Sequence, residues 1–426
     1  MKINKCIVCS NKIIPFLNLG KQALANSFLD NKIDNEYKED LIACFCESCK
    51  LVQLDTIIDK HRLFDDYIWV TGTSKTTHKH AKTFAEKLND ELVLQSNDLV
   101  LEVASNDGSY LRYFQELGLE VIGYDPAKNI AKIANDAGIK TIAEYFSLEA
   151  LKDFSSVSSK KPKVIIARNV LTHTRDPLPL EMALAVKSIL AKDGTFVIET
   201  PYLGNIIDQV QYDLFYHEHE VYFSVKSLSN LLNKAELSIV NVQPISGGPS
   251  GGGNILVYAM HTDATITRSK NVAKYLKHEE YELNKLDILK TFANKAYDLR
   301  DRLNTKILEC YNNNKVIYGY GAAAKGNTIL NFCNEALHKN LNDMILYIVD
   351  SSQMKQEKLT PGTQIRVVSP EYAQQVMPDI YLILAWNFAN DIIRRETVFT
   401  DVGGKFIIAN PYIPVDLDLE CFVERF

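Results

Sequence analysis

The sequence predicts an α/β protein in which a cysteine-rich head precedes two separate α/β units. Three observations support this prediction. Five of the eight cysteines fall within the first 49 residues. After the head, apolar runs of strand length alternate with helical segments in two separate stretches, a pattern typical of parallel sheets. The glycine-rich run at 246–254 and a helical region at about 266–312 separate these stretches.

Length and composition narrow the class of protein. The 426 residues suffice for about three domains, with 46% hydrophobic and 23% charged residues, as in ordinary globular proteins. The net charge is -6, and basic residues are scattered, so we expect no nucleic-acid partner. No apolar run approaches the ~20 residues of a membrane span, and the N-terminus lacks a secretory apolar core. We therefore expect a cytoplasmic protein with no membrane partner.

The head, expected at residues 1–74, contains two cysteine knuckles. Cys6-x2-Cys9 and Cys46-x2-Cys49 each allow two thiolates to face one ion. Four thiolates form the tetrahedral set that structural zinc prefers. Such a site has no open position, so the zinc should stabilise the head rather than catalyse. Cys44 breaks the spacing and is left out of the ligand set; the alternative is a group of unpaired thiols in a small core.

The first α/β unit is expected at residues 75–250. A helical stretch is followed by an apolar strand, a glycine turn, a second helix and three further strands. This order of elements predicts a Rossmann-like domain. The helical stretches are 78–90 and 109–118, and the strands are 98–104, 119–125, 163–171 and 194–203.

Polar residues follow the strands of this unit. Glu102 ends the first strand and precedes a turn containing Asn106 and Gly108, although the G-x-G-x-x-G motif of dinucleotide binders is missing. Asp125 follows the second strand, where a carboxylate can bind both ribose hydroxyls. Glu144, Tyr145 and Phe146 offer a polar edge and an aromatic face for a purine. The alternative is a generic α/β core with ordinary acids at its strand ends.

These residues, with the loop after the fourth strand, resemble a class I S-adenosylmethionine-dependent methyltransferase. The resemblance implies S-adenosylmethionine as the cofactor and a Rossmann-like central domain. The cofactor-binding residues that it implies are Glu102, Asn106, Gly108, Asp125, Glu144, Tyr145, Phe146 and Asn169.

The second α/β unit, expected at residues 251–426, contains another glycine turn. Gly319-x-Gly321-x-x-Ala324 matches the dinucleotide fingerprint in its G-x-G-x-x-A form, and Asp350 ends the next strand. By itself this pattern favours NAD and an oxidoreductase. The acid lies 29 residues beyond Gly321 (350 minus 321), further than the ~20 of the usual fingerprint. Lys325 at the start of the following helix also makes a good anion site.

Across nearly its whole length the chain resembles sugar C-methyltransferases that act on nucleotide-linked keto-deoxysugars. The shared order is a four-cysteine head, a methyltransferase core, a Tyr-x-Glu-His segment and a second Rossmann-like α/β domain. The most specific parts are Tyr216–His219 and Gly319–Asn331. The resemblance implies structural zinc, and a dTDP- or GDP-type nucleotide-diphosphate keto-deoxysugar as the substrate. We therefore expect methyl transfer to C3 of a 4-keto-6-deoxyhexose.

The stretch Tyr216-His217-Glu218-His219 carries the predicted chemistry. A sugar carbon becomes a nucleophile only after a base removes a proton next to a carbonyl, and histidine suits that task. The resemblance implies that His219 is the base, that Tyr216 and His173 stabilise the enolate, and that Glu218 orients a histidine. His217 receives no role. Alternatively, His217 and His219 on one face of a strand could bind a transition metal.

The remaining predicted site residues come from elsewhere in the chain. Tyr67 lies in a head segment that resembles the family only weakly. The tail turn is expected to bind the substrate diphosphate, although a glycine turn that only packs is the alternative. The substrate-binding candidates are Asn254, Gly319, Tyr320, Gly321 and Lys325. Two rival functions stay open: an NAD-dependent nucleotide-sugar oxidoreductase or epimerase, and a zinc-headed scaffold that binds sugar nucleotides without chemistry.

Overall fold

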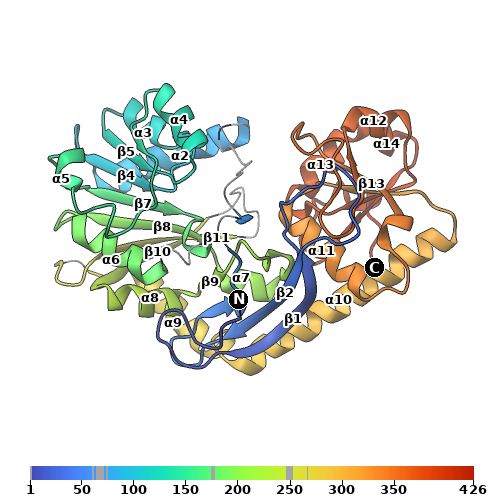
Figure 1. Cartoon of the computed structure of the whole chain (residues 1–426), viewed down its shortest axis with the longest axis horizontal. Coiled ribbons are helices and arrows are strands. Elements are labelled where there is room, and N and C mark those ends of the chain that lie inside the picture. The colour runs from blue at the N-terminus through green and yellow to red at the C-terminus, as the bar shows by residue number, and fades with distance from the viewer. Residues whose placement is uncertain are drawn as a thin grey trace.

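The described residues of the computed structural model form three β-sheets, which correspond to the head and the two α/β units (Figure 1). It describes residues 2–59, 62–63, 72, 75–173, 178–245, 253–265 and 267–426. The two α/β units lie beside each other, and the head sheet and the long helix α10 run beneath both (Figure 1). Among the described helices, none is long and apolar enough to cross a bilayer.

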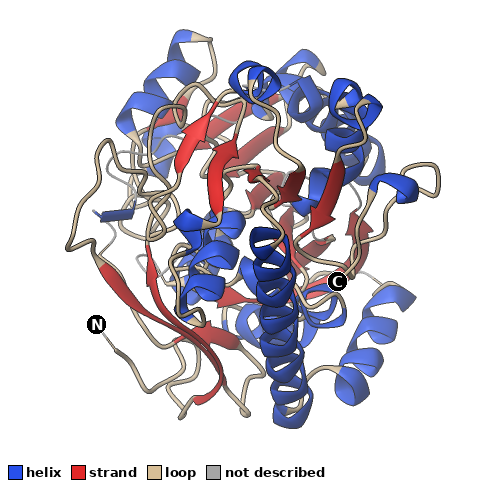
Figure 2. Ribbon diagram, turned by 90° about the vertical axis from the view of Figure 1, so that its right-hand side faces the viewer, coloured by secondary structure: helices blue, strands red, loops and turns tan. Residues whose placement is uncertain are grey.

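The head is built on a four-stranded sheet in the order β1-β2-β3-β9. Strands β1 (Ile14–Ala23), β2 (Lys38–Phe45) and β3 (Val52–Leu54) are antiparallel neighbours. The long strands β1 and β2 run along one side of the molecule (Figure 2). The fourth strand, β9 (Val221–Tyr222), follows the Tyr-x-Glu-His segment and pairs with β3. The head sheet is therefore completed by the first α/β unit.

The first α/β unit has a seven-stranded sheet in the order β10-β11-β8-β7-β4-β5-β6. The four strands expected from the sequence are present, as β4, β5, β7 and β8. The sheet extends past residue 250, because β11 pairs antiparallel with both β8 and β10. The strands are β4 (Leu99–Val103), β5 (Glu120–Tyr124), β6 (Thr141–Ile142), β7 (Val164–Arg168), β8 (Thr195–Pro201), β10 (Leu237–Ile245) and β11 (Asn254–His261).

Helices accompany this sheet in the alternation that the sequence predicts. The first of them, α2, packs against α3, and α3 contacts β5. The helices are α2 (Lys75–Leu92), α3 (Leu111–Glu116), α4 (Lys128–Asp136), α5 (Phe154–Val157), α6 (Pro179–Ile189), α7 (Leu203–Asp208) and α8 (Val225–Lys234).

Two helices join the units. They are α9 (Lys270–Glu282) and α10 (Leu286–Asn312), and α10 packs against β1 of the head, α7 of the first unit and α11 of the second. The buried carboxylate of Glu279 on α9 accepts the backbone N–H groups of Val225 and Lys226 at 2.7 Å each. This satisfies two otherwise unpaired donors at the start of α8 and fixes α9 to the first unit.

The second α/β unit has a parallel five-stranded sheet in the order β14-β13-β12-β15-β16. Its strands are β12 (Ile317–Tyr320), β13 (Ile345–Val349), β14 (Arg366–Val368), β15 (Ile380–Ile383) and β16 (Lys405–Ile408). Its helices are α11 (Ala324–Glu335), α12 (Pro370–Gln375), α13 (Ala389–Arg395) and α14 (Thr397–Asp401). The first strand, β12, lies between β13 and β15, so the order of strands reverses there. Ligands of open α/β sheets bind at such a switch point.

The loop after β1 connects the head to the second unit. In Figure 1 this blue loop lies against the orange and red C-terminal unit. Leu29 forms a bridge with Leu359, and the Ala25 carbonyl accepts the Asn327 amide at 2.6 Å. The start of α11 is therefore held by the head.

Candidate active site and metal centre

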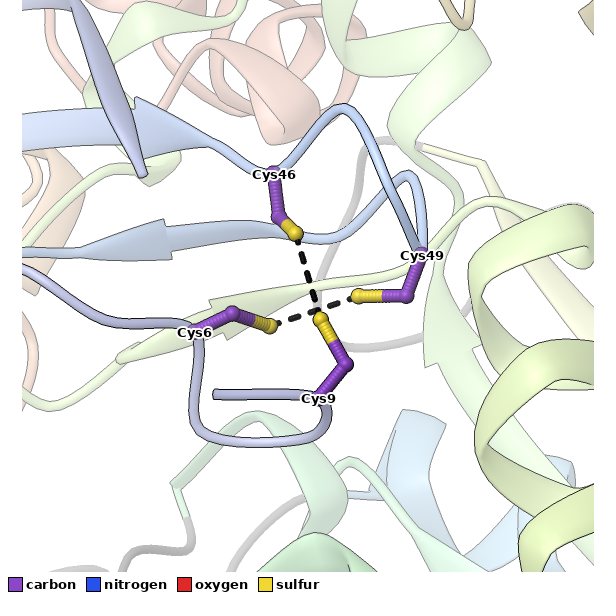
Figure 3. A group of neighbouring side chains, drawn as sticks. All are labelled: Cys6, Cys9, Cys46 and Cys49. Carbon is purple, nitrogen blue, oxygen red and sulfur yellow. Dashed lines mark hydrogen bonds between the residues drawn. The ribbon is translucent and has the colours of Figure 1, made fainter. Parts of the chain in front are cut away.

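The four knuckle cysteines converge in the head (Figure 3). The sulfur atoms of Cys6, Cys9, Cys46 and Cys49 all lie within 4.8 Å of one another. The shortest separations are 3.3 Å for Cys6–Cys49 and 3.4 Å for Cys9–Cys46. This compact donor set fits a tetrahedral zinc ion. Cys44 lies apart from it on β2, where burial raises the pKa of its thiol to about 12.

Each knuckle has the same backbone geometry. The residue after its second cysteine is left-handed, with φ of 60° at Ser10 and 62° at Lys50. Their N–H groups donate to the carbonyls of Cys6 and Cys46 at 2.9 and 2.8 Å. The two knuckles therefore fold alike and present paired sulfurs toward each other.

The turn after β4 has an unusual backbone. Ala104, Asn106 and Gly108 all lie in the left-handed region, at φ of 53°, 52° and 74°. Only glycine adopts this conformation without strain, and asparagine adopts it more readily than alanine. A side chain at Gly108 would also meet Ile139 at 2.9 Å. The backbone is thus tightly curved where the sequence predicts the cofactor.

Asp125 fastens this turn to the end of β5. Its Oδ2 accepts the Asn106 N–H and its Oδ1 accepts the Ala127 N–H, both at 2.9 Å. Burial raises the pKa of the carboxyl, and the two backbone donors oppose that rise. Each carboxylate oxygen has a second lone pair, so Asp125 can still accept from a ribose hydroxyl.

Two buried carboxylates lie around Arg168 beneath the turn. Arg168 Nε donates to Glu102 Oε1 at 2.9 Å, and its guanidinium is 3.9 Å from Glu199 Oε2 and stacks 3.0 Å from the Tyr110 ring centroid. Burial raises the pKa of Glu102 to about 7. Among the described residues, Glu102 Oε2 and Glu199 Oε2 have no hydrogen-bond partner. These oxygens suit a ligand with N–H donors and positive charge, as S-adenosylmethionine has.

The other predicted cofactor residues lie around the same sheet edge. Asn169 has a left-handed φ of 54° and accepts from Asn254 Nδ2 at 3.2 Å. Asn254, expected on the substrate side, begins β11 and also donates to Glu199 at 2.9 Å. It therefore belongs to the first unit. Glu144 and Tyr145 are exposed, whereas Phe146 is buried and packs edge-on against Tyr124, with centroids 5.4 Å apart.

The predicted catalytic residues come together around His219. Tyr216 Oη lies 2.7 Å from His219 Nε2, and the His173 ring meets the His219 ring edge-on at 4.7 Å between centroids. His173 ends the 3-10 helix Leu171–His173 after β7, whereas Tyr216 and His219 follow the 3-10 helix Tyr212–Leu214. We call Tyr216, His173 and His219 the imidazole cluster.

The segment that carries Tyr216 and His219 is a turn rather than a strand. The His219 N–H donates to the Tyr216 carbonyl at 2.8 Å. His217 therefore points elsewhere, and its Nε2 donates to the Asp40 carbonyl at 3.3 Å. The alternative of His217 and His219 on one face of a strand is wrong, because residues 216–218 form a turn and the two rings have different partners. Among the described residues, the four cysteines are the only group of three or more possible metal ligands.

Burial sets the protonation of the site. It lowers the pKa of His219 well below its usual range, and His173 and Lys325 add to this effect. Burial also lowers the pKa of His173 to about 4. Both rings are therefore neutral near pH 7, and a neutral imidazole can accept a proton. The pKa of the Glu218 carboxyl is shifted upward instead. Burial raises it to about 7, and a hydrogen bond from Asn26 opposes the rise.

The second unit contributes Lys325, whose charge acts on His219 of the imidazole cluster. Its ammonium lies 4.2 Å from the Trp386 ring centroid, and Trp386 Nε1 donates to Asp213 Oδ2 at 2.6 Å. Burial lowers the pKa of Lys325 to about 8, and the negative charge of Asp213 opposes this decrease. Burial raises the pKa of Asp213 to about 6, and the positive charge of Lys325 opposes this increase. Sequence reasoning assigned no role to Asp213 or Trp386, whose hydrogen bond connects the first unit to the second.

The other residues of the tail turn have packing partners. Tyr320 donates to Glu396 at 2.6 Å and accepts from Arg395 at 2.8 Å. A side chain at Gly321, where φ is 93°, would meet Ala385 at 2.4 Å, and one at Gly319 would meet Ile348 at the same distance. Tyr67, the last predicted site residue, lies outside the described residues.

Comparisons with known proteins match all three parts of the chain. Family models match as "Putative zinc binding domain" over residues 6–64, "Methyltransferase domain" over 77–242 and "C-methyltransferase C-terminal domain" over 249–411. The C-methyltransferase NovU of Streptomyces niveus is 31% identical over 413 residues, covering 96% of both chains.

Solved methyltransferase structures overlap the chain only in part. A Burkholderia thailandensis 1,6-didemethyltoxoflavin-N1-methyltransferase is 18% identical, with a TM-score of 0.37, over 55% of this chain and 99% of its own. An S-adenosylmethionine-dependent methyltransferase from Clostridium acetobutylicum is 14% identical, with a TM-score of 0.35, over 47% of this chain and 97% of its own. These TM-scores are too low to carry an argument.

Proposed function

Because the chain belongs to the S-adenosylmethionine-dependent C-methyltransferases with an N-terminal zinc-binding domain, we propose that it methylates C3 of a nucleotide-linked 4-keto-6-deoxyhexose. The family assignment replaces the two rival functions considered from the sequence, an NAD-dependent oxidoreductase or epimerase and a scaffold without chemistry. The observation that carries the proposal is the imidazole cluster, because transfer to carbon requires removal of a proton from that carbon.

His219 is the proposed base. One of its ring nitrogens donates to the Leu214 carbonyl, which leaves Nε2, the atom facing Tyr216, as the acceptor. In the proposed reaction Nε2 takes the proton from C3 of the sugar. A positioned general base of this kind contributes roughly 10²–10⁴-fold to the rate.

The enolate oxygen at C4 needs hydrogen-bond donors. Tyr216 flanks His219 and is the proposed donor to this oxygen, its hydroxyl hydrogen turning from His219 Nε2 to the enolate. The single N–H of neutral His173 is donated to the Glu218 carbonyl, so His173 is proposed to hold the His219 ring in place through its edge-on contact. When bound, S-adenosylmethionine supplies a methyl group that its positive sulfur makes electrophilic. The electron pair left at C3 would form the new carbon–carbon bond while the methyl–sulfur bond breaks and its electron pair goes to sulfur, which leaves S-adenosylhomocysteine; His219 retains the proton.

The diphosphate is assigned to the junction between the two units. Lys325 lies in the first turn of α11, whose N-terminus favours anions. Asn327, which is 1% exposed, has an Oδ1 without a hydrogen-bond partner among the described residues, as do both amide atoms of Asn387. Of these atoms only Asn387 Nδ2 is a donor; Asn387 directly follows Trp386, the ring against which Lys325 lies, so this unsatisfied donor supports an anionic ligand here.

Isotope exchange tests this function. The protein is incubated with S-adenosylmethionine and dTDP- or GDP-linked 4-keto-6-deoxyhexose that carries deuterium at C3. We expect loss of the deuterium and a product heavier by one methyl group. Methylation with full retention of the deuterium would contradict the proposal.

A further inference from the structure

The dipeptide Ala25–Asn26 connects the head to both α/β units. Only Leu24 separates it from the end of β1, and it forms the first turn of the loop that reaches the second unit. Asn26 Nδ2 donates to Glu218 Oε1 at 2.7 Å, and the Ala25 carbonyl accepts from Asn327 Nδ2 at 2.6 Å. The two hydrogen bonds span 192 and 302 positions of sequence. One short turn of the head thus contacts the Tyr-x-Glu-His segment and the start of α11.

The turn itself is fixed by its backbone. The Ser27 N–H donates to the Leu24 carbonyl at 3.0 Å, and the Phe28 N–H donates to the Asn26 carbonyl at 3.1 Å. The neighbouring strand β1 packs against α10 and α11. The Asn26 amide is therefore presented from a constrained backbone rather than from a mobile loop tip.

Glu218 needs such a partner. Its side chain is 5% exposed, and a buried carboxylate is costly unless a donor compensates for the lost water. The carboxamide of Asn26 supplies that donor. A hydrogen bond from a neutral amide favours the ionised carboxylate without adding a charge next to the imidazole cluster.

We infer that Asn26 is a positioning residue, whose amide holds the Glu218 carboxylate in place beside the imidazole cluster. This inference rests on the proposed function for its catalytic consequence, because Glu218 acts there through its neighbours. The head thereby contributes to the active site a residue that is not part of the zinc centre.

The titratable groups near Glu218 and its neighbours are histidine, tyrosine and lysine side chains. The His173 ring donates to the Glu218 backbone carbonyl from the loop after β7. Tyr216 and His219 flank it on its own segment, and Lys325 acts on His219 from α11. These groups stay in place when Asn26 is changed, so a change in the titration of Glu218 reports on the amide.

The first test measures the titration of Glu218 directly. Infrared difference spectra follow the carbonyl stretch of protonated carboxyl groups, and the Glu218→Gln variant identifies the band of Glu218. Asn26→Asp is isosteric with the native residue and places a second carboxyl against Glu218. Asn26→Leu removes the donor without adding charge.

We expect both Asn26 variants to raise the pKa of Glu218 above its native value of about 7, by about one unit or more. The Asp variant should produce the larger shift, because like charges add to the loss of the donor. Asn35→Leu, in the exposed part of the same loop, is the matched control and should leave the band unchanged. Titration of Glu218 at the native pH in both Asn26 variants would overturn the inference.

The second test measures catalysis. The acidic limb of the kcat/KM profile should move to higher pH in Asn26→Asp and Asn26→Leu, while Asn26→Ser, which retains a donor, should restore part of the native profile. If the native protein does not methylate the sugar, the proposed function fails, and the infrared titration still decides the role of Asn26. If the native protein is active and the limb does not move, the positioning role is wrong.

Discussion

In both α/β units, an aspartate after the second strand accepts a backbone N–H group of the glycine turn. In the first unit, Asp125 accepts the N–H of Asn106 in the turn and the N–H of the residue two positions after itself. In the second unit, Asp350 accepts the N–H groups of Ala322 and Ser352, both at 2.8 Å. The same arrangement of an aspartate and two backbone donors thus occurs in both units.

The side chains around the two turns differ in charge. The first turn lies over Glu102 and Glu199, two buried carboxylates that share one guanidinium. The second turn has two lysines beside it. Lys325, in the helix that follows the turn, lies against Trp386, and Lys355 donates to the Ala322 carbonyl of the turn at 2.8 Å. The backbone is therefore alike in the two turns, whereas the nearby side chains are acidic in one unit and basic in the other, as the proposed binding of a cationic cofactor and an anionic substrate requires.

Under the proposed function the reaction takes place at the imidazole cluster, so the largest effect should come from His219. We expect His219→Asn to lower methyl transfer by roughly 10²–10⁴-fold and to abolish exchange of the C3 proton. Deuterium exchange followed by NMR measures this.

His217→Asn is the matched control for that variant, since His217 lies two residues away and faces the head. It should keep exchange within a few-fold of the native rate. Equal losses in both variants would indicate a general structural role for this segment.

The next effect tests the acidic first turn. Glu102→Gln replaces the carboxyl beneath the first turn by a neutral amide, and hydrogen bonds to charged groups contribute about 1.5–3 kcal/mol. We expect S-adenosylmethionine to bind roughly 10–100-fold more weakly, as measured by calorimetry. The affinity for the sugar nucleotide should stay the same. Weaker binding of both ligands would contradict the assignment of the cofactor to the first unit and the substrate to the second.

The reciprocal change in the second turn should have a smaller effect. Lys325→Met keeps the apolar stem against Trp386 and removes the ammonium. We expect about tenfold weaker binding of the sugar nucleotide, because Asp213 already neutralises part of the lysine charge. S-adenosylmethionine affinity should be unchanged; if it falls instead, the lysine serves the first unit.

The smallest effect concerns backbone strain. Ala104 occupies the left-handed region without being glycine, which costs about 1–2 kcal/mol, although glycine loses part of this gain through its greater unfolded entropy. Ala104→Gly should therefore stabilise the protein by about 0.5–1 kcal/mol in denaturant unfolding. Gly321→Ala should destabilise it by at least ~1 kcal/mol, because φ is 93° there and Ala385 is in the way.

Local patterns made part of this site predictable from the sequence. The four cysteines converge as expected, because a knuckle is defined within four residues. Glu102 lies in β4 and Asp125 directly follows β5, two strands that their apolar runs predicted. Strand β11 was not expected in the first unit, since the glycine run before it is typical of a domain edge.

Long-range contacts could not be predicted in this way. Asn26 and Glu218 are 192 positions apart, and Trp386 and Asp213 are 173 positions apart. The local sequence around each residue does not indicate its distant partner. The shape of the Tyr-x-Glu-His segment was also missed, because four polar and aromatic residues fit a turn as well as a strand.

The position of the transferred methyl group tests the central claim most directly. S-adenosylmethionine with a ¹³C-labelled methyl group is turned over with the keto-deoxysugar nucleotide, and the product is analysed by carbon NMR. We predict a methyl signal coupled to C3 of the hexose, and no such product from His219→Asn. A labelled methyl group on oxygen or nitrogen would contradict the account.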